Sequence, residues 1–363
     1  MTVTYHSGRR IQATQADFDG TPAISGGWKE LARTTLSGSA TSVDVTGLAD
    51  KRYYMVLYNM IDDGTNTQFV TNQFGNGSFD TGSNYAERGS SNGAADFTYT
   101  GQAYWNTSGG DQVCPELTVQ YIANKSDKEK LGISHSCGAQ ADGAGTAPNR
   151  REHTGKWANT SNVIDRIRAT TAYGSRSYGT GSEVVVLGYD PDDTHTTNFW
   201  EELASVTLGT DGDVLSSGTF TAKKYLWVQA FIKNSGTSTR YNTEMTFNGD
   251  TGSNYSERRS LDGSSDATSV NQTKIMNSGV TGSDDDLWCL NMFIINNSAN
   301  EKLCIGHGFD TYAGSGAGTA PSQRFEKVAK WANTSSQITN ITITNSDTSN
   351  YDAISELRVW GSN

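Results

Sequence analysis

An internal duplication is the feature that most constrains how this chain can fold. The six residues DTGSNY stand at positions 80–85 and again at 250–255, an offset of 170. Other segments recur in the same order, with offsets between 170 and 174. They are WKELA and WEELA at 28–32 and 200–204, EKL at 129–131 and 301–303, GAGTAP at 143–148 and 316–321, and KWANTS at 156–161 and 330–335. A unit of about 160 residues exceeds the 20–50 residues of a solenoid repeat, so each copy is predicted to be a domain with its own core.

The repeats and the sequence between them predict four parts. Residues 1–27 precede the first copy and are predicted to be an extended N-terminal arm. The two copies are residues 28–189 and 200–363, joined by a linker at 190–199 that contains one proline. A short linker of this kind keeps two domains close together.

The apolar residues of each copy follow the two-residue period of a β-strand. In segment 53–60, Tyr54 and Val56 point to one face and Met55 to the other. The chain has 39 Gly and only 5 Pro, and Gly, Asn, Ser and Asp cluster between such segments, which is typical of many strands joined by turns. About eight strands per copy favour a jelly roll over a seven-stranded immunoglobulin sandwich. The predicted fold class is all-β: two tandem duplicated jelly-roll-like antiparallel β-sandwiches with an extended N-terminal arm. Residues 28–33 would form one helical turn at most.

Each KWANTS segment carries a tryptophan, Trp157 in the first copy and Trp331 in the second. A tryptophan ring contributes a large apolar area when it is buried. Because both copies retain the ring among polar neighbours, we predict that each tryptophan is an anchor that packs on its own sandwich.

The charge balance excludes some classes of partner. Lys plus Arg number 28 against 39 Asp plus Glu, which gives a net charge of −11. Such a chain is not attracted to nucleic acid or to an anionic membrane, and we expect neither as a partner. No run of 18 apolar residues predicts a membrane span, and no apolar stretch follows Arg9 and Arg10 as in a signal peptide. We therefore expect synthesis in a cytosol.

No catalytic motif stands out. The sequence contains no nucleophile elbow, P-loop, Rossmann fingerprint, HExxH or CxxC, so we predict neither an enzyme nor a cofactor. His135 and His307 are equivalent in the two copies, and a structural hydrogen bond is predicted for this position, with catalysis or metal binding as alternatives. The acidic runs at 190–193 and 284–286 are predicted to be solvated turns, with Ca²⁺ ligation as the alternative.

The four cysteines are predicted to be unpaired thiols. They are not equivalent between the copies, and no secretion signal suggests an oxidising compartment. A turn centred between Lys125 and Ser126 would place Cys114 opposite Cys137, so one cross-strand bond remains open. Cys289 and Cys304 would be out of register with each other.

The N-terminal arm contains apolar and basic residues that suit contact with another subunit. These predicted partner-binding residues are Tyr5, Arg9, Arg10, Ile11 and Phe18. Such an extended segment could gain contacts along a neighbour's surface, where the two arginines would meet acidic groups. The alternative is a disordered tail.

Several motifs resemble a module of virion proteins from marine tailed bacteriophages and archaeal tailed viruses. They are GWKELARTTL at 27–36, DKRYYMVL at 50–57, FNGDTGSNY at 247–255, FIINNSANEKL at 293–303, and GAGTAP followed by KWANTS. The resemblance covers residues 27–363 and implies a structural component of the virion. The first copy departs from the pattern at 113–116 and at its His-Ser-Cys-Gly stretch, 135–138.

The resemblance implies a viral structural protein that decorates the capsid or forms a tail accessory. It would act by binding other virion subunits, as a homo-oligomer, and would be located in the virion after assembly in the host cytoplasm. The alternative is a fibre or appendage module that binds host surface glycans. Its predicted contact aromatics are Tyr104, Trp105 and Tyr312.

Overall fold

The computed structural model describes residues 24–25, 27–64, 70–107, 115–171, 176–191, 193–195, 197–236, 240–281, 286–311, 317–318 and 320–363. These residues contain strands and turns, and no helix occurs among them. Accordingly, no helix in the described part of the chain is long and apolar enough to cross a membrane. The all-β prediction is confirmed.

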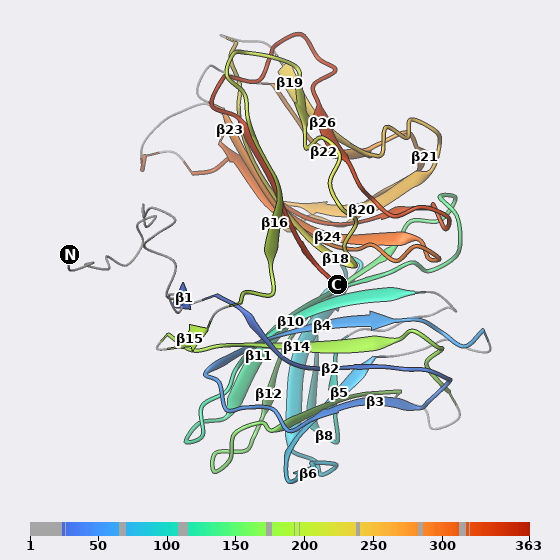
Figure 1. Cartoon of the computed structure of the whole chain (residues 1–363), viewed down its shortest axis with the longest axis vertical. Helices are drawn as coiled ribbons and strands as arrows, with labels where there is room; N and C mark the ends of the chain where they lie inside the picture. The colour runs from blue at the N-terminus through green and yellow to red at the C-terminus, as the bar shows by residue number, and fades with distance from the viewer. Residues whose placement is uncertain are drawn as a thin grey trace, which may run out of the picture.

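Two sandwiches account for most of the strands (Figure 1). The strands of the first sandwich are β2 (Lys29–Thr35), β3 (Ser42–Thr46), β4 (Tyr53–Met60), β5 (Thr71–Asn76), β6 (Ser78–Phe79), β7 (Tyr85–Ser91), β8 (Phe97–Gln102), β9 (Trp105–Asn106), β10 (Glu116–Ala123), β11 (Lys130–Gly138), β12 (Asn149–Trp157), β13 (Arg166–Thr170) and β14 (Glu183–Tyr189). Those of the second are β16 (Glu201–Thr207), β17 (Val214–Ser216), β18 (Tyr225–Lys233), β19 (Arg240–Phe247), β20 (Tyr255–Leu261), β21 (Ala267–Gln272), β22 (Ile275–Thr281), β23 (Leu287–Ile295), β24 (Lys302–Thr311), β25 (Gln323–Trp331), β26 (Ile341–Thr344) and β27 (Glu356–Ser362).

The two sandwiches have the same strand order, which confirms the duplication. The larger sheet of the first has eight strands in the order β2-β14-β4-β10-β11-β12-β7-β8, and that of the second runs β16-β27-β18-β23-β24-β25-β20-β21. The smaller sheets are β3-β13-β5-β6, with β9 beside β5, and β17-β26-β19-β22. The pairing registers also agree: Cys137 faces Arg150 in the first sandwich, and Phe309 faces Arg324 in the second. Structural equivalence therefore matches the sequence offsets residue by residue.

Each sandwich has a core between its larger and smaller sheets. Trp157 and Trp331 are both buried, with 1% of each side chain's surface exposed, so their prediction as anchors is confirmed. Residues 28–33 form no helical turn, because the segment pairs as β2 with β14.

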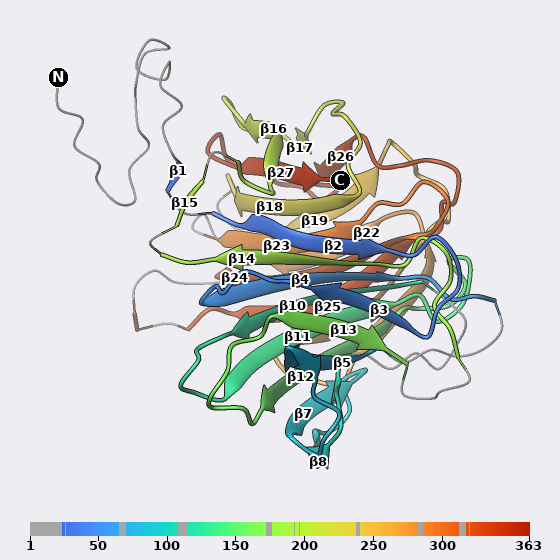
Figure 2. The same cartoon turned by 60° about the horizontal axis from the view of Figure 1, so that its bottom comes forward.

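A third apolar cluster lies between the sandwiches, where the two eight-stranded sheets face each other. The sheets meet at one end, where the loop after β11 reaches the second sandwich on the right of Figure 1, and diverge toward the other end. The linker contributes a short strand, β15 (Thr194–His195), that pairs with β1 (Ile24–Ser25) at the edge of the molecule (Figures 1 and 2). The segment predicted as an arm therefore ends in a strand held by the linker. The predicted arm residues Tyr5, Arg9, Arg10, Ile11 and Phe18 lie outside the described residues.

Candidate functional site

The contact between the sandwiches has an apolar centre made of different surfaces on its two sides. From the first sandwich, β4, β10, β11 and β14 contribute Met55, Leu57, Leu117, Val119, Cys137, Val185 and Leu187. From the second, β18, β23, β24 and β25 contribute Tyr225, Phe293, Ile295, Leu303, Ile305 and Val328. Burial of this much apolar surface stabilises the contact, because each fully buried large side chain is worth about 1.5–3 kcal/mol.

Glu183 is a buried carboxylate at the edge of this contact. The hydroxyl of Tyr225 donates a hydrogen bond to Oε1 of Glu183 at 2.8 Å, and Nζ of Lys224 lies 3.0 Å from the same oxygen. Burial opposes ionisation of Glu183, but hydrogen bonds from Thr35 and Tyr225 and the charge of Lys224 outweigh it and lower the pKa of this carboxyl. A charged group of the first sandwich is thus neutralised by the second.

The loop after β11, residues 139–148, docks on the second sandwich by its backbone. Lys330 and Arg258 donate to its carbonyl oxygens, and the carboxylate of Glu301 accepts from its Gly143 amide. The contacts are Lys330 Nζ to Ala139 O at 3.1 Å and to Ala141 O, Arg258 Nε to Pro148 O at 2.8 Å, and Gly143 N to Glu301 Oε1 at 2.5 Å. The GAGTAP motif of the first copy is therefore a docking loop as well as a turn.

Arg150, on β12, adds an ion pair to the same end of the contact. Its guanidinium lies 2.7 Å from Asp266 and 3.0 Å from Glu326, both on the second sandwich. The arginine is buried, so these charge-assisted bonds are stronger than exposed ones.

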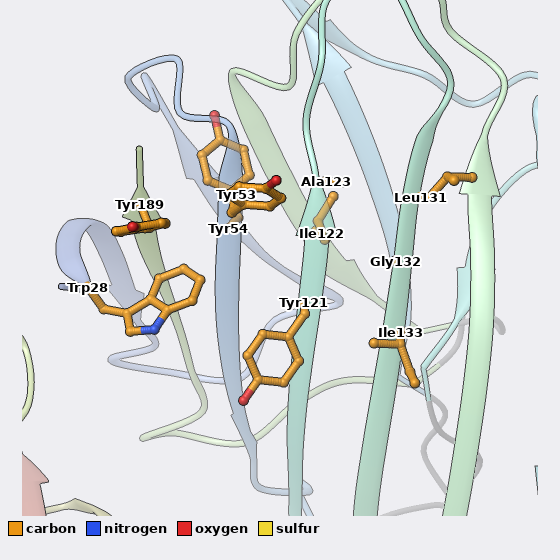
Figure 3. Close-up of a pocket in the computed structure, with 10 residues that line it drawn as sticks. All are labelled: Trp28, Tyr53, Tyr54, Tyr121, Ile122, Ala123, Leu131, Gly132, Ile133 and Tyr189. Carbon is orange, nitrogen blue, oxygen red and sulfur yellow. The ribbon is translucent and has the colours of Figure 1, made fainter. Parts of the chain in front are cut away.

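The opposite end of the first sandwich's sheet is uncovered. Here β4, β10, β11 and β14 line a groove of about 530 Å³ together with Trp28 (Figure 3). The rings of Trp28 and Tyr189 lie 5.8 Å apart, and those of Tyr53 and Tyr189 lie 6.3 Å apart. We name this surface the uncovered face and define it by Trp28, Tyr53, Tyr121, Leu131, Ile133 and Tyr189; Trp28 and Tyr121 form its border with the contact.

The uncovered face is equivalent to the part of the second sandwich that is buried in the contact. Trp28 corresponds to Trp200, and Tyr121 to Phe293. The exposed fractions differ sharply: 41% for Tyr53 against 2% for Tyr225, 55% for Leu131 against 0% for Leu303, and 39% for Ile133 against 3% for Ile305. Equivalent apolar side chains are thus buried in the second sandwich and exposed to solvent in the first.

His135 of the first sandwich and His307 of the second are half-buried and lie against each other across the contact. Their ring centroids lie 4.4 Å apart, edge to face, in place of the predicted hydrogen bond. Burial lowers the pKa of His135 to about 4, with smaller contributions from Arg150 and His153. Burial also lowers the pKa of His307 to about 3, with a smaller contribution from His135, so both rings are neutral at pH 7. The rings therefore pack as apolar groups.

These two histidines and Glu152 have the chemistry of metal ligands. One ligand atom from each lies within 4.8 Å of the others, and imidazole nitrogens and carboxylate oxygens are ligands that zinc takes in proteins. Arg150 already lies 2.5 Å from Glu152, so positive charge is present at the carboxylate. Burial and the neighbouring Glu326 raise the pKa of Glu152 to about 7 in spite of Arg150.

The predicted glycan-contact aromatics do not form a site. Trp105 is fully buried against the backbones of Gly132 and Gly155, so no sugar can stack on its ring, and its prediction as a glycan contact is wrong. Tyr104 is half-buried, and Tyr312 lies outside the described residues. Of the exposed aromatic rings described on the first sandwich's large sheet, Tyr53 lies on the uncovered face and Tyr99 lies on the edge strand β8.

The acidic runs divide between surface and interior. Asp193 forms an ion pair with Lys51, and Asp190 is half-buried. Asp286, predicted to lie in a solvated turn, is buried, because β23 begins at the next residue. Its negative charge adds to burial in raising the pKa of Asp310 to about 6.

Three cysteines are described, and all three are free thiols. Cys137 faces Leu117 across the β10–β11 ladder, so the predicted register that placed it opposite Cys114 is wrong by three residues; Cys114 itself lies outside the described residues. Cys304 faces Ile294, while Cys289 faces Phe309.

Comparisons with known proteins assign no family to this chain. No family model and no curated protein matches it. Among solved structures it is similar to domains LG4–5 of the mouse laminin alpha1 chain, at 8% identity over 93% of this chain and 91% of that one, with a TM-score of 0.20. It is also similar to the LG1–3 region of the laminin alpha2 chain, at 8% identity over 89% and 66%, with a TM-score of 0.22.

Proposed function

We propose that this chain is a non-catalytic structural subunit of a virus particle, which decorates the capsid or forms a tail accessory. It binds a further β-sandwich subunit through the uncovered face of its first sandwich. The observation that carries the proposal is a difference in exposure between equivalent positions of the two copies. In the first sandwich, Tyr53, Leu131 and Ile133 are exposed. Their equivalents in the second, Tyr225, Leu303 and Ile305, are buried against the other sandwich. The virus setting comes from the sequence resemblance alone.

The chemistry of the partner follows from what covers the equivalent surface. There, an apolar sheet face, a carboxylate and a row of backbone carbonyls meet Tyr225, Lys224 and Lys330. Their equivalents Tyr53, Arg52 and Lys156 would receive the same groups from the partner. An apolar patch with a polar rim is typical of a protein interface.

Two measurements test the structural role. Mass spectrometry of purified virions should find the chain in stoichiometric amounts, and a cryo-EM map of the intact particle should show pairs of sandwiches at symmetric positions. A second sandwich-sized density should cover Tyr53 and Leu131. Absence of the chain from purified particles would contradict the proposal.

Glycan binding is the second candidate function, and the aromatic lining of the groove favours it. The rings of Trp28 and Tyr53 lie 5.8 and 6.3 Å from the ring of Tyr189, as a platform for the apolar faces of sugars would need. A glycan array with wild-type protein and a Tyr53→Ala variant separates the two functions. Binding that depends on Tyr53 would support the glycan function.

A further inference from the structure

The contact within the chain joins unlike surfaces, so each sandwich retains one surface that is not used. On the first sandwich it is the uncovered face. On the second it is the surface equivalent to the first sandwich's side of the contact, which we name the distal face and define by the described residues Phe309, Pro321, Arg324 and Glu356. All four are accessible: Phe309 is 45% exposed, Pro321 is exposed, and the side chains of Arg324 and Glu356 are 56% and 39% exposed.

We infer that the uncovered face of one copy of this chain binds the distal face of a second copy, so that copies join head to tail. The contact between chains would repeat the contact within each chain. This inference rests on the proposed function, that the uncovered face binds a subunit, and it names the subunit. A contact between two different surfaces closes into a ring or extends into a filament, depending on its rotation.

Polar partners of the internal contact have preserved equivalents on the two free surfaces. Within the chain, Glu183 contacts Tyr225 and Lys224; the equivalent groups on the free surfaces are Glu356, Tyr53 and Arg52. The hydrogen bond from Arg258 to the carbonyl of Pro148 has its equivalents in Arg88 and the carbonyl of Pro321. The ion pair of Asp266 with Arg150 has its equivalents in Asp96 and Arg324. In each case one member lies on the first sandwich and the other on the second, as a head-to-tail contact needs.

On the first sandwich, local ion pairs hold Arg88 and Lys156. Arg88 lies 3.5 Å from Asp96, and both side chains are more than half exposed. Lys156 pairs with Glu129 at 2.9 Å, while the equivalent Lys330 reaches across the contact to the docking loop. Exposed pairs of this kind contribute about 0–1 kcal/mol, so a partner can displace them at little cost.

The distal face is more polar than the surface to which it is equivalent. Leu57, Val119 and Val185 of the first sandwich correspond to Gln229, Asn291 and Arg358 of the second. Half-buried Trp227 and Trp360 and exposed Phe309 supply apolar area there. Non-obligate interfaces have this mixed composition, so we expect reversible, concentration-dependent association, with the first sandwich's apolar surface reserved for the permanent contact.

Sedimentation velocity on the full chain tests the inference with two blocking variants. Leu131→Asp blocks the uncovered face and Phe309→Asp blocks the distal face; both side chains are exposed, so the sandwiches should fold. Each variant alone is expected to be monomeric, because every head-to-tail contact would include a blocked surface. An equimolar mixture should form a 1:1 dimer that grows no further, while wild type forms larger species. Val214→Asp, at a 47% exposed site on the outer sheet, is the matched control and should behave as wild type.

A charge exchange keeps the test independent of these apolar sites. Arg52→Glu and Glu356→Arg should each raise the dissociation constant at least tenfold, and mixing the two variants should restore association.

A wild-type chain that is monomeric up to about 0.5 mM overturns the inference, since even a weak specific contact would be populated there. So does a Phe309→Asp variant that dimerises alone, because its uncovered faces would then bind each other. A chain found in virions yet monomeric in solution refutes only this inference; association without presence in virions refutes only the proposed structural role.

Discussion

The indole Nε1 of Trp331 donates a hydrogen bond to Oδ2 of Asp250 at 2.7 Å, joining the KWANTS motif to the DTGSNY motif. Trp157 and Asp80 make the same bond at 2.7 Å in the first sandwich. Asp250 also accepts from the backbone of Gly252, which fixes the turn before β20. Two of the three six-residue segments that recur unchanged in the duplication are therefore halves of one structural contact.

Replacing the ring of Trp331 should destabilise the second sandwich. Trp331→Ala leaves a cavity in the core and removes one of the hydrogen bonds to Asp250, and we expect a loss of about 3–5 kcal/mol. Trp331→Phe keeps most of the packing and should lose less. Calorimetric unfolding of both variants measures the effect. An unchanged transition in Trp331→Ala would contradict the anchor role.

Gly155 should not tolerate a side chain, whereas Gly138 should. A Cβ at Gly155 would lie 2.4 Å from the ring of Trp105, while one at Gly138 would meet nothing closer than 4.0 Å. We expect Gly155→Ala to destabilise the first sandwich by about 1–3 kcal/mol, the usual range for overpacking. Gly138→Ala, in the neighbouring strand, is the matched control. Urea titration followed by tryptophan fluorescence compares the two, and equal midpoints would refute the prediction.

Asp310 should make stability depend on pH. Burial, together with Asp286 and Asp262, raises the pKa of this carboxyl to about 6 from an ordinary value of 3.8. The folded state therefore holds the proton more tightly, and this contribution to stability is present below pH 4 and lost as pH rises through 6. Asp310→Asn should gain about 1–3 kcal/mol over wild type at pH 8 and little at pH 4. A difference between the two proteins that does not vary with pH would contradict the assignment.

The described cysteines should differ in reactivity. Burial raises the pKa of the Cys137 and Cys304 thiols, which lie inside the contact and the second core, whereas Cys289 is only half-buried. Brief alkylation of the native protein, read by mass spectrometry, should modify Cys289 before the other two. Denatured, unreduced protein should be modified at all three. Protection of any of them after denaturation would indicate a disulfide.

The fold class could be predicted from the sequence because it depends on the two-residue alternation of apolar side chains along each strand. The duplication and the two buried KWANTS tryptophans could be predicted because they depend on segments that the sequence repeats. Trp105 does not, because its burial depends on Gly132 and Gly155, which approach it from two other strands. The register of Cys137 was missed because the hairpin's turn is placed differently from the symmetric centre that the sequence suggested.

The contact between the sandwiches was also missed, although the sequence carries a signal for it. Val119 and Val185 are apolar where the second copy has Asn291 and Arg358. When equivalent positions on the outer face of the two large sheets are apolar in one copy and polar in the other, that face is covered by another part of the protein in the apolar copy only. Reading the signal requires the strand register, because only the register shows which residues share a face.

The apolar outer face of the first sandwich has a consequence during synthesis. The residues that bury Leu117, Val119 and Val185 belong to the second sandwich, which leaves the ribosome later. At 5–20 residues per second, about 160 residues of translation leave this face open to water for roughly 8–30 s. In that interval chaperones and neighbouring nascent chains can bind this exposed apolar face. The order of the two copies in the chain therefore decides which face must be protected from such binding during synthesis.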